Sequence, residues 1–182
     1  DSQAGRGPRL PLESVMKRVL VFALGIAMTA CTNVKQVPDE SAVGDTIDAQ
    51  NQELVECWNG GEYECVAGFF SEEGWQMMPN AQAQAGTEAV SRFWQQAFGW
   101  GQWEFSMETS LLEQSGPVAI ERGKYTIRFM ADAAAPPGRP SSQDRGNYVT
   151  HWRMDSDGRW RIAAQALVSE VPARVIPAPP GI

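Results

Sequence analysis

Histidine and cysteine are scarce in this sequence, and no cluster of basic residues occurs in it. The single histidine, His151, has no cysteine at a spacing typical of a metal site, so we expect no metal and no other cofactor. Residues 1–30 hold two of the 22 acidic and four of the 15 basic residues, which leaves 20 acids against 11 bases and a formal charge of −9 in the rest. A surface of this charge repels polyanions, and nucleic acid is therefore excluded as a partner.

The apolar run at residues 19–30 is too short to cross a bilayer. It has twelve residues, whereas a spanning helix needs about 20. Lys17 and Arg18 precede it, and this order predicts a secretory signal peptide over residues 16–30. Residues 1–15 contain no methionine and no periodic pattern, so we interpret them as upstream or cloning-derived sequence outside the fold.

The signal segment ends in Met-Thr-Ala-Cys, which resembles the lipobox of bacterial lipoproteins. The resemblance implies cleavage before Cys31 and acylation of this cysteine, and more than one acyl chain anchors a protein stably. Thr32 stands where an aspartate would indicate the inner membrane, so we expect a lipid-anchored, periplasm-facing protein of the cell envelope, in the outer membrane. The alternative is a soluble secreted protein that is cut near Ala30.

Two further cysteines, Cys57 and Cys65, form an even number in a compartment that oxidises thiols. A disulfide between them would close a short loop and stabilise the fold by about 2.5 kcal/mol. The alternative is a pair of buried thiols that pack as small hydrophobic side chains. The sequence leaves both possibilities open.

The rest of the chain divides into a linker, one domain and a tail. Residues 31–44 are polar and unpatterned, which is typical of a tether. Residues 45–170 carry the periodic patterns of a single domain, without internal repeats. Residues 171–182 hold four prolines and are expected to be extended.

Three helices are predicted in the first half of the domain. Apolar residues at helical spacing from Ile47 to Trp58 predict the first helix, which two glycines end. A shorter helix is expected over 62–70, followed by a short strand over 75–78. Apolar residues at i, i+3, i+4, i+7 and i+8 over 90–98 predict the third helix.

After the third helix the apolar period changes to two, which predicts an antiparallel meander of four strands. Along the second strand, the apolar residues move from the even-numbered to the odd-numbered positions. A bulge would produce this change, and we expect it at Gly123. Residues 131–146 are predicted to form a long loop. After a hairpin turn at 157–158, every second residue from Trp160 to Val168 is expected to face the core.

This order of elements predicts an α+β fold in which three N-terminal helices pack on a strongly curved antiparallel sheet, a cone-shaped α+β barrel. Four stretches carry a resemblance to a known family: "CWNGGEYECVAGFFSEEGWQMMPN", "GTEAVSRFW", "ERGKYTIRF" and "GNYVTHWRMDSDGRWRIA". They resemble the SnoaL-like, nuclear transport factor 2-like superfamily over about residues 45–169, and in particular its small domains of undefined function. The resemblance implies the cone fold.

The resemblance does not select a reaction, because the superfamily includes isomerases, dehydratases, cyclases and domains without catalysis. Its ketosteroid isomerase branch uses a carboxylate base, a tyrosine and a protonated aspartic acid. The corresponding positions of this chain carry Met78, Leu54 and Thr150, none of which can perform that chemistry. We therefore exclude an isomerase of this mechanism.

Few titratable residues are candidates for catalysis. Glu121 and Tyr125 are the two we select, because a buried carboxylate can act as an acid or a base. The alternative for Glu121 is an ion pair with Arg122 or Arg128. His151 lies between Thr150 and Trp152, which are expected to face inward, so its own side chain is expected on the outer face of the sheet.

Aromatic and methionine residues point to binding instead. If their side chains converge in the cone, they form a pocket for a small apolar or aromatic molecule, and the alternative is a solid core. The residues expected to contact a ligand are Trp58, Trp75, Met78, Trp103, Tyr125, Tyr148, Thr150 and Trp152.

The expected function is therefore that of a membrane-anchored periplasmic domain that binds a small apolar or aromatic molecule. A lyase, isomerase or hydrolase-type enzyme that uses a pocket glutamate or tyrosine is the alternative. A second alternative is a homodimeric interaction module, which would pair through the outer sheet face at Val149, His151 and Arg153.

Overall fold

The computed structural model describes residues 40–177, which belong to a unit that is separate from residues 1–36. The predicted signal segment, the predicted lipidation site at Cys31 and most of the predicted linker lie outside the described residues. Within residues 40–177, no helix is both long and apolar enough to span a membrane.

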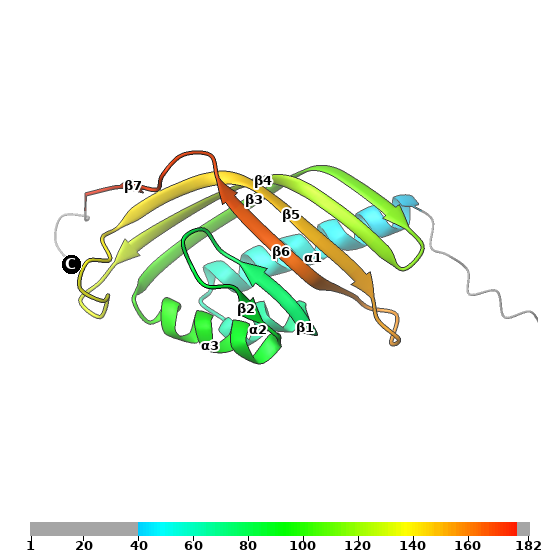
Figure 1. Ribbon diagram of the computed structural model, residues 1–182, viewed down its shortest axis with the longest axis horizontal. Coiled ribbons are helices and arrows are strands. Elements are labelled where there is room, and N and C mark those ends of the chain that lie inside the picture. The colour runs from blue at the N-terminus through cyan, green and yellow to red at the C-terminus, as the bar shows by residue number, and fades with distance from the viewer. Residues whose placement is uncertain (1–39, 178–182) are drawn as a thin grey trace, which may run out of the picture. The chain divides into compact units, whose positions relative to one another are not determined.

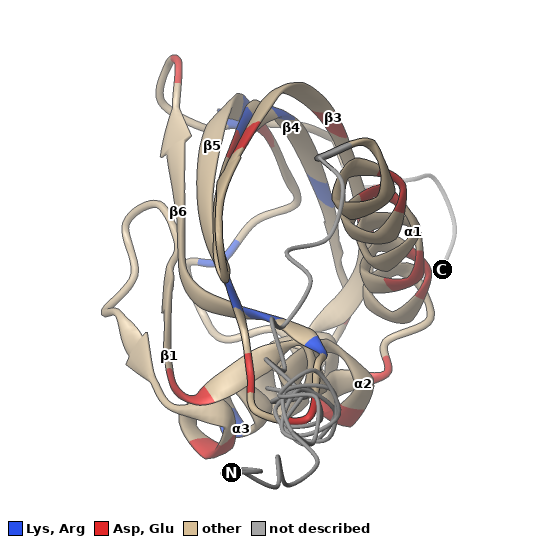
Figure 2. Cartoon of the chain, turned by 90° about the vertical axis from the view of Figure 1, so that its right-hand side faces the viewer, with Lys and Arg blue, Asp and Glu red and all other residues tan. Residues whose placement is uncertain are grey.

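The first helix, α1 (Glu40–Asn59), has one apolar stripe. Its buried residues recur every three to four positions from Val43 to Trp58, and the stripe contacts β3 (Gly101–Ser115). Figure 2 shows acidic residues along α1, and its sequence contains neither lysine nor arginine. Because Val43 is buried, the helix extends before the predicted domain boundary, and the predicted linker is wrong for residues 40–44.

The second helix, α2 (Tyr63–Gly68), follows α1 after a tight turn in which Gly61 has φ 72°. A disulfide joins Cys57 of α1 to Cys65 of α2, with a Cα–Cα distance of 5.8 Å. Of the two alternatives for these cysteines, the structure therefore contains the bridge.

We expect reduction of this disulfide to lower the free energy of unfolding by about 2.5 kcal/mol, because the bridge restricts the unfolded chain over a short loop. Urea unfolding of the wild-type protein with and without dithiothreitol measures the effect. The Cys57→Ala/Cys65→Ala double variant is the control, since its unfolding should not respond to the reductant. Equal wild-type midpoints under both conditions would contradict the prediction.

The strands form one curved sheet in the order β2-β1-β6-β5-β4-β3, with β7 beside β5 (Figure 1). Strands β3 to β6 form the predicted antiparallel meander. The strands other than β3 are β1 (Phe70–Met77), β2 (Gln84–Ala85), β4 (Val118–Ala131), β5 (Ser142–Met154), β6 (Trp160–Ser169) and β7 (Arg174–Val175).

One strand pair departs from the prediction, because β1 runs parallel to β6. Parallel neighbours need a long crossover between them, and here α3 (Thr87–Phe98) and the strands β3 to β5 provide it. The sheet is therefore mixed and not wholly antiparallel. Strand β1 also begins at Phe70, earlier than the predicted strand over 75–78.

Three helices pack on the concave side of this sheet, as the sequence predicts. Figure 2 looks along the cone and shows α1 beside β3 and β4, with α2 and α3 below. Helix α3 contacts β1, β2 and β3, so its buried face closes the concave side at that end. The α+β cone fold is thereby confirmed.

The predicted bulge at Gly123 is wrong. Burial alternates strictly along β4, and its pairing with β5 continues without a shift. The extra residue lies instead on β3 at Ser110, opposite Gly123 and Arg122. Ile120 is consequently 41% exposed on the outer face, because the polar Glu121 takes the inward position beside it.

A second bulge, at Ala163 on β6, changes which residues face the core. Trp152 pairs with Ile162 but His151 pairs with Ala164, so Ala163 is the extra residue. Beyond this point the inward positions belong to Gln165 and Leu167, and Val168 is exposed. The prediction of one uninterrupted inward face from Trp160 to Val168 is therefore wrong.

Candidate functional site

Glu121, on β4, is fully buried and accepts four hydrogen bonds. Its Oε1 accepts from Asn51 Nδ2 (2.7 Å), Thr109 Oγ1 (2.7 Å) and the Tyr148 hydroxyl (2.5 Å). Its Oε2 accepts from Trp152 Nε1 (2.7 Å). Both carboxyl oxygens of Glu121 therefore have donors within the protein. We call these five residues the Glu121 cluster.

The Glu121 cluster joins α1, β3, β4 and β5 without a positive charge. The alternative of an ion pair with an arginine is not observed, since Arg122 and Arg128 are exposed and point outward. Arg128 instead pairs with Glu104 at 3.5 Å. Because protein donors already bind the carboxylate, this geometry favours a structural role for Glu121.

The middle of the cone is filled by a second set of polar contacts. Trp94 Nε1 donates to Gln76 Oε1 (2.7 Å), and Gln76 Nε2 donates to Gln165 Oε1 (3.4 Å). Gln165 Nε2 in turn donates to Thr150 Oγ1 (3.4 Å). All four side chains are buried. This part of the interior is therefore a packed core and not a pocket.

A cavity of about 320 Å³ lies at the end of the cone where β3 and β5 begin and β4 ends. Its walls include Phe93 and Trp94 of α3, Trp103 of β3 and Phe129 of β4. The ring centroids of Trp103 and Phe129 are 4.5 Å apart, and those of Trp94 and Trp103 are 5.6 Å apart. We call this space the aromatic cavity.

Arg139 lies at the rim of the aromatic cavity, in the loop between β4 and β5. Its guanidinium carbon is 4.9 Å from the ring centroid of Trp100, 5.9 Å from that of Trp103 and 5.8 Å from that of Phe129. Such distances are typical of cation–π contacts. Within residues 40–177, Arg139 forms no ion pair.

Asp144 is the carboxylic acid that lines the aromatic cavity. It lies on β5 on the same inward face as Tyr148. Its Oδ2 accepts from the Tyr125 hydroxyl (2.9 Å) and from Ser169 Oγ (2.8 Å). Its Oδ1 is buried and has no hydrogen-bond partner in the described part of the chain. Because this atom has almost no exposed surface, a molecule in the cavity does not reach it, and both oxygens of Asp144 are held within the protein.

The two buried tyrosines both stay protonated at neutral pH. Burial raises the pKa of Tyr125 to about 12, and the neighbouring Asp144 acts in the same direction. Burial and the hydrogen bond to Glu121 also raise the pKa of Tyr148. Tyr125 therefore serves as a hydrogen-bond donor to Asp144, and it is poorly suited to the role of a base.

We expect the free energy of unfolding to fall as the pH rises from about 10 to about 12, partly because of Tyr125. In this range the unfolded chain releases the phenol proton while the folded chain retains it, which favours the unfolded state. Urea unfolding at a series of pH values measures the slope. The slope should be smaller in Tyr125→Phe, and an unchanged slope would contradict the assignment.

Three of the residues predicted to contact a ligand lie at this end of the cone. Met78 and Trp103 line the aromatic cavity, and Tyr125 binds Asp144 at its wall. Trp75 does not point into the cone as expected, because β1 places Gln76 inward and leaves Trp75 50% exposed. The other four predicted residues are buried in the packed interior: Trp58, Tyr148, Thr150 and Trp152.

Sequence reasoning missed Asp144 and Arg139, since both fell in the loop predicted over 131–146. The ladder between β4 and β5 extends as far as Phe129 opposite Ser142, so the loop covers only 132–141. The inward-facing residues at the start of β5 are small or polar. A strand was predicted only where every second residue is apolar, so this part of β5 could not be recognised from the sequence.

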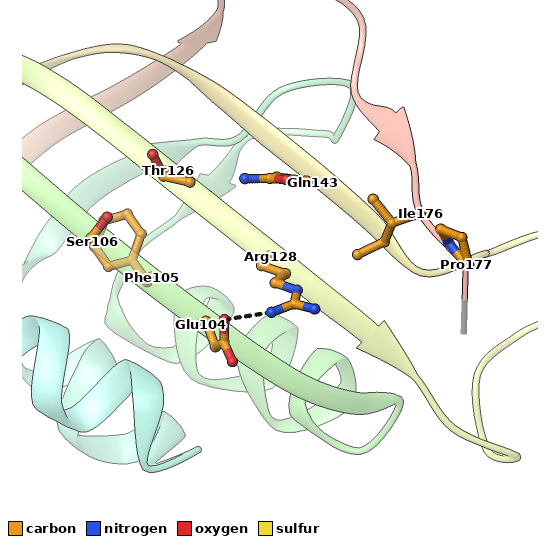
Figure 3. A pocket seen from close by; sticks show the side chains of 8 residues that line it. All are labelled: Glu104, Phe105, Ser106, Thr126, Arg128, Gln143, Ile176 and Pro177. Carbon is orange, nitrogen blue, oxygen red and sulfur yellow. Dashed lines mark ion pairs between the residues drawn. The ribbon is translucent and has the colours of Figure 1, made fainter. Parts of the chain in front are cut away.

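A further hollow, of about 480 Å³, lies on the convex face of the sheet (Figure 3). Outward-facing side chains line it, among them the Glu104–Arg128 ion pair, with Ile176 and Pro177 at one side. His151 also lies on the convex face, as predicted. Because this hollow is an open, charged surface, the aromatic cavity is the stronger candidate for a binding site.

One group of three side chains in residues 40–177 has a spacing that could suit a metal: Cys57, Glu62 and Cys65. The two sulfurs are joined in the disulfide, so neither is available as a thiolate ligand.

Comparisons with known proteins agree with this fold. The sequence profile of the SnoaL-like domain matches residues 51–163. A nuclear transport factor 2-like superfamily protein from Salmonella enterica is similar in structure, with a TM-score of 0.62 and 14% identity over 79% of this chain and 97% of that one. Comparison with proteins of curated function returns no match.

Two further structures are similar at the same level. A putative scytalone dehydratase from Novosphingobium aromaticivorans has a TM-score of 0.63 and 13% identity, over 76% of this chain and 91% of that one. A ketosteroid isomerase-like protein from Erwinia carotovora atroseptica has a TM-score of 0.61 and 16% identity, over 70% and 96%. At these identities the similarity shows the fold alone.

Proposed function

This chain belongs to the SnoaL-like domain family, and on that basis we propose that its domain binds a small, largely apolar or aromatic molecule in the aromatic cavity. The observation that carries the proposal is the composition of this cavity. Four aromatic rings line a space of about 320 Å³ that also holds one carboxylate, a combination typical of small-molecule sites.

The position of the polar clusters supports binding over catalysis. The carboxylate of Glu121 is occupied by four donors, and Glu121 lies eight residues from Phe129 along β4, roughly 25 Å at the rise of an extended strand. The acid nearest the cavity is Asp144, whose Oδ2 is held by two hydroxyl groups. Since its Oδ1 is buried as well, neither of these acids is free to act as an acid or a base, which favours binding by the aromatic walls.

The binding test uses the fluorescent apolar probe N-phenyl-1-naphthylamine and two matched variants of α3. Phe93→Ala removes a ring that lines the aromatic cavity, whereas Phe98→Ala removes a similarly half-buried ring from the same helix that does not line it. We expect Phe93→Ala to weaken binding about tenfold or more and Phe98→Ala to change it less than twofold. Equal effects of both variants, or no saturable binding to the wild-type protein, would contradict the proposal.

We further propose that the domain is anchored by acyl chains on Cys31 and faces the periplasm. The order of the N-terminal sequence supports this: two basic residues, then an apolar run, then Met-Thr-Ala-Cys. The Cys57–Cys65 disulfide also supports it, since disulfides persist in oxidising compartments. Metabolic labelling with an alkyne fatty acid should mark the wild-type protein in the membrane fraction. In Cys31→Ser the label should disappear and the protein should become soluble, and a labelled Cys31→Ser protein would contradict the proposal.

Self-association through the convex face is a second proposed function, supported by the exposed apolar residues of that face. Trp75, Ile120, Val149 and Val168 come from four strands and are between 41% and 63% exposed. Sedimentation velocity of the wild-type protein should show a dimer. Val149→Glu should shift it to the monomer, whereas Val171→Glu, beyond the end of β6, should not. A wild-type monomer at all concentrations would rule out the dimer.

A further inference from the structure

Arg139 and Asp144 are the two ionisable residues that line the aromatic cavity, and they differ in access. Both oxygens of Asp144 are covered, because Oδ2 accepts two hydrogen bonds and Oδ1 has almost no exposed surface. Arg139 is exposed. The hydrogen bonds that arginine side chains donate within residues 40–177 come from Arg92 and Arg161, so the N–H donors of the Arg139 guanidinium have no partner in this part of the chain.

The guanidinium of Arg139 lies against the aromatic rings at the rim of the cavity. Its central carbon is 4.9 Å from the ring centroid of Trp100 and 5.8 Å from that of Phe129. A guanidinium group that packs on aromatic faces still presents its N–H groups in its own plane, where they match the geometry of a carboxylate. The rings therefore position the cation without using its donors.

The loop that carries Arg139 is anchored on both sides of this residue. Before it, a turn is closed by the hydrogen bond from the Arg139 amide to the carbonyl oxygen of Pro136 (3.1 Å). After it, Ser141 is buried, and its Oγ accepts from the amide of Ala131 at the end of β4 (3.0 Å). A residue that is already positioned loses less conformational entropy when it binds a ligand.

From these contacts we propose that the ligand of the aromatic cavity is an aromatic carboxylate, whose carboxylate group binds the guanidinium of Arg139 at the rim. This inference rests on the proposed binding function and adds the chemical class of the ligand. The ring of the ligand would pack against Phe93 and Trp103, where contacts between rings are favourable. The carboxylate would accept charge-assisted hydrogen bonds from the planar fork of the arginine.

The charges at the cavity favour an anion over a cation. A cationic ligand would be repelled by Arg139 and would not reach the covered oxygens of Asp144. A neutral ligand would contact the rings but would gain no charge-assisted hydrogen bond from Arg139. The carboxylate of an anionic ligand would lie at the exposed rim, where water and salt screen its repulsion from Asp144.

The test compares three molecules of nearly the same size by their displacement of N-phenyl-1-naphthylamine from the protein. 4-Ethylbenzoate carries the carboxylate, 4-ethylbenzamide keeps its shape without the charge, and 4-ethylbenzylamine presents a cation at neutral pH. We expect the wild-type protein to bind the benzoate about fivefold or more tightly than the benzamide, a size suited to a bidentate ion pair at an exposed rim. The amine should bind most weakly.

Two variants assign this preference to one side chain. In Arg139→Gln the preference for the benzoate over the benzamide should disappear, while both molecules still displace the probe. Arg174→Gln is the matched control, because Arg174 is an exposed arginine of β7 that does not line the aromatic cavity. Both substitutions remove one positive charge from the same part of the protein, and Arg174→Gln should keep the preference.

The outcomes separate this inference from the proposed binding function. If the probe binds but the benzamide competes as well as the benzoate, or the benzoate does not displace the probe, the inference is overturned while the cavity remains a binding site. The inference is also overturned if the preference survives in Arg139→Gln or is lost equally in Arg174→Gln. If neither the probe nor any of the three molecules binds, the proposed binding function itself fails.

Discussion

Replacing Glu121 by alanine is expected to lower the free energy of unfolding by about 4 kcal/mol. The substitution removes the acceptor of four donors at once, from Asn51, Thr109, Tyr148 and Trp152. Each buried donor left without a partner costs about 1–3 kcal/mol, and some of this cost is recovered if water enters.

Urea unfolding followed by tryptophan fluorescence measures this loss. Glu121→Gln should cost less, about 2 kcal/mol, because the amide keeps one acceptor oxygen but turns an NH₂ group toward the remaining donors. Glu108→Ala, an exposed glutamate on β3, is the control and should stay within about 0.5 kcal/mol of wild type. An equal effect of Glu121→Ala and Glu108→Ala would show that the Glu121 cluster does not stabilise the fold.

Replacing Gly123 by alanine is expected to cost about 3 kcal/mol. An added Cβ would lie 2.1 Å from the backbone oxygen of Glu108 and 2.6 Å from the ring of Tyr148. The backbone oxygen belongs to the strand that pairs with Gly123, so it cannot move without disturbing the bulge at Ser110. A displaced Tyr148 ring would also weaken the hydrogen bond from its hydroxyl group to Glu121.

Gly68→Ala is the matched control for this substitution. An added Cβ at Gly68 meets nothing within 4 Å, and the residue belongs to α2. There the same chemical change should be neutral or should stabilise the protein by up to about 1 kcal/mol, since alanine restricts the unfolded chain. Urea unfolding of both variants measures the difference. If Gly123→Ala were as stable as Gly68→Ala, the close packing around the β3 bulge would be refuted.

Glu121 and Asp144 both lie on the inward face of the sheet, but their surroundings differ. Glu121 accepts hydrogen bonds from four side chains. Asp144 accepts two through Oδ2 and retains an unpaired Oδ1 in an aromatic wall. Both carboxyl groups are held by the protein, but of the two only Asp144 lines the aromatic cavity. Sequence reasoning selected Glu121 as a candidate and overlooked Asp144, because only Glu121 lay in a segment with a recognisable strand pattern.

The helices, the meander and the glycine turns could be predicted because their signals are local. Apolar residues from Val43 to Trp58 share one helical face wherever the helix is placed, and the same holds for α3. The alternation of Tyr148, Thr150 and Trp152 likewise set the inward face of β5 correctly. These features depend on residues a few positions apart.

The sequence by itself determined the number and order of the main elements, the family resemblance and the aromatic character of the interior. Only the tertiary structure decided which face of β6 turns inward, since one extra residue at Ala163 reverses the parity of every residue after it. It also decided that Asp144 meets Tyr125 and Ser169, because that contact forms only when β4, β5 and β6 are in register. Periodicity reports the nearest neighbours along the chain, whereas a cavity depends on which strands lie side by side and how far each is displaced.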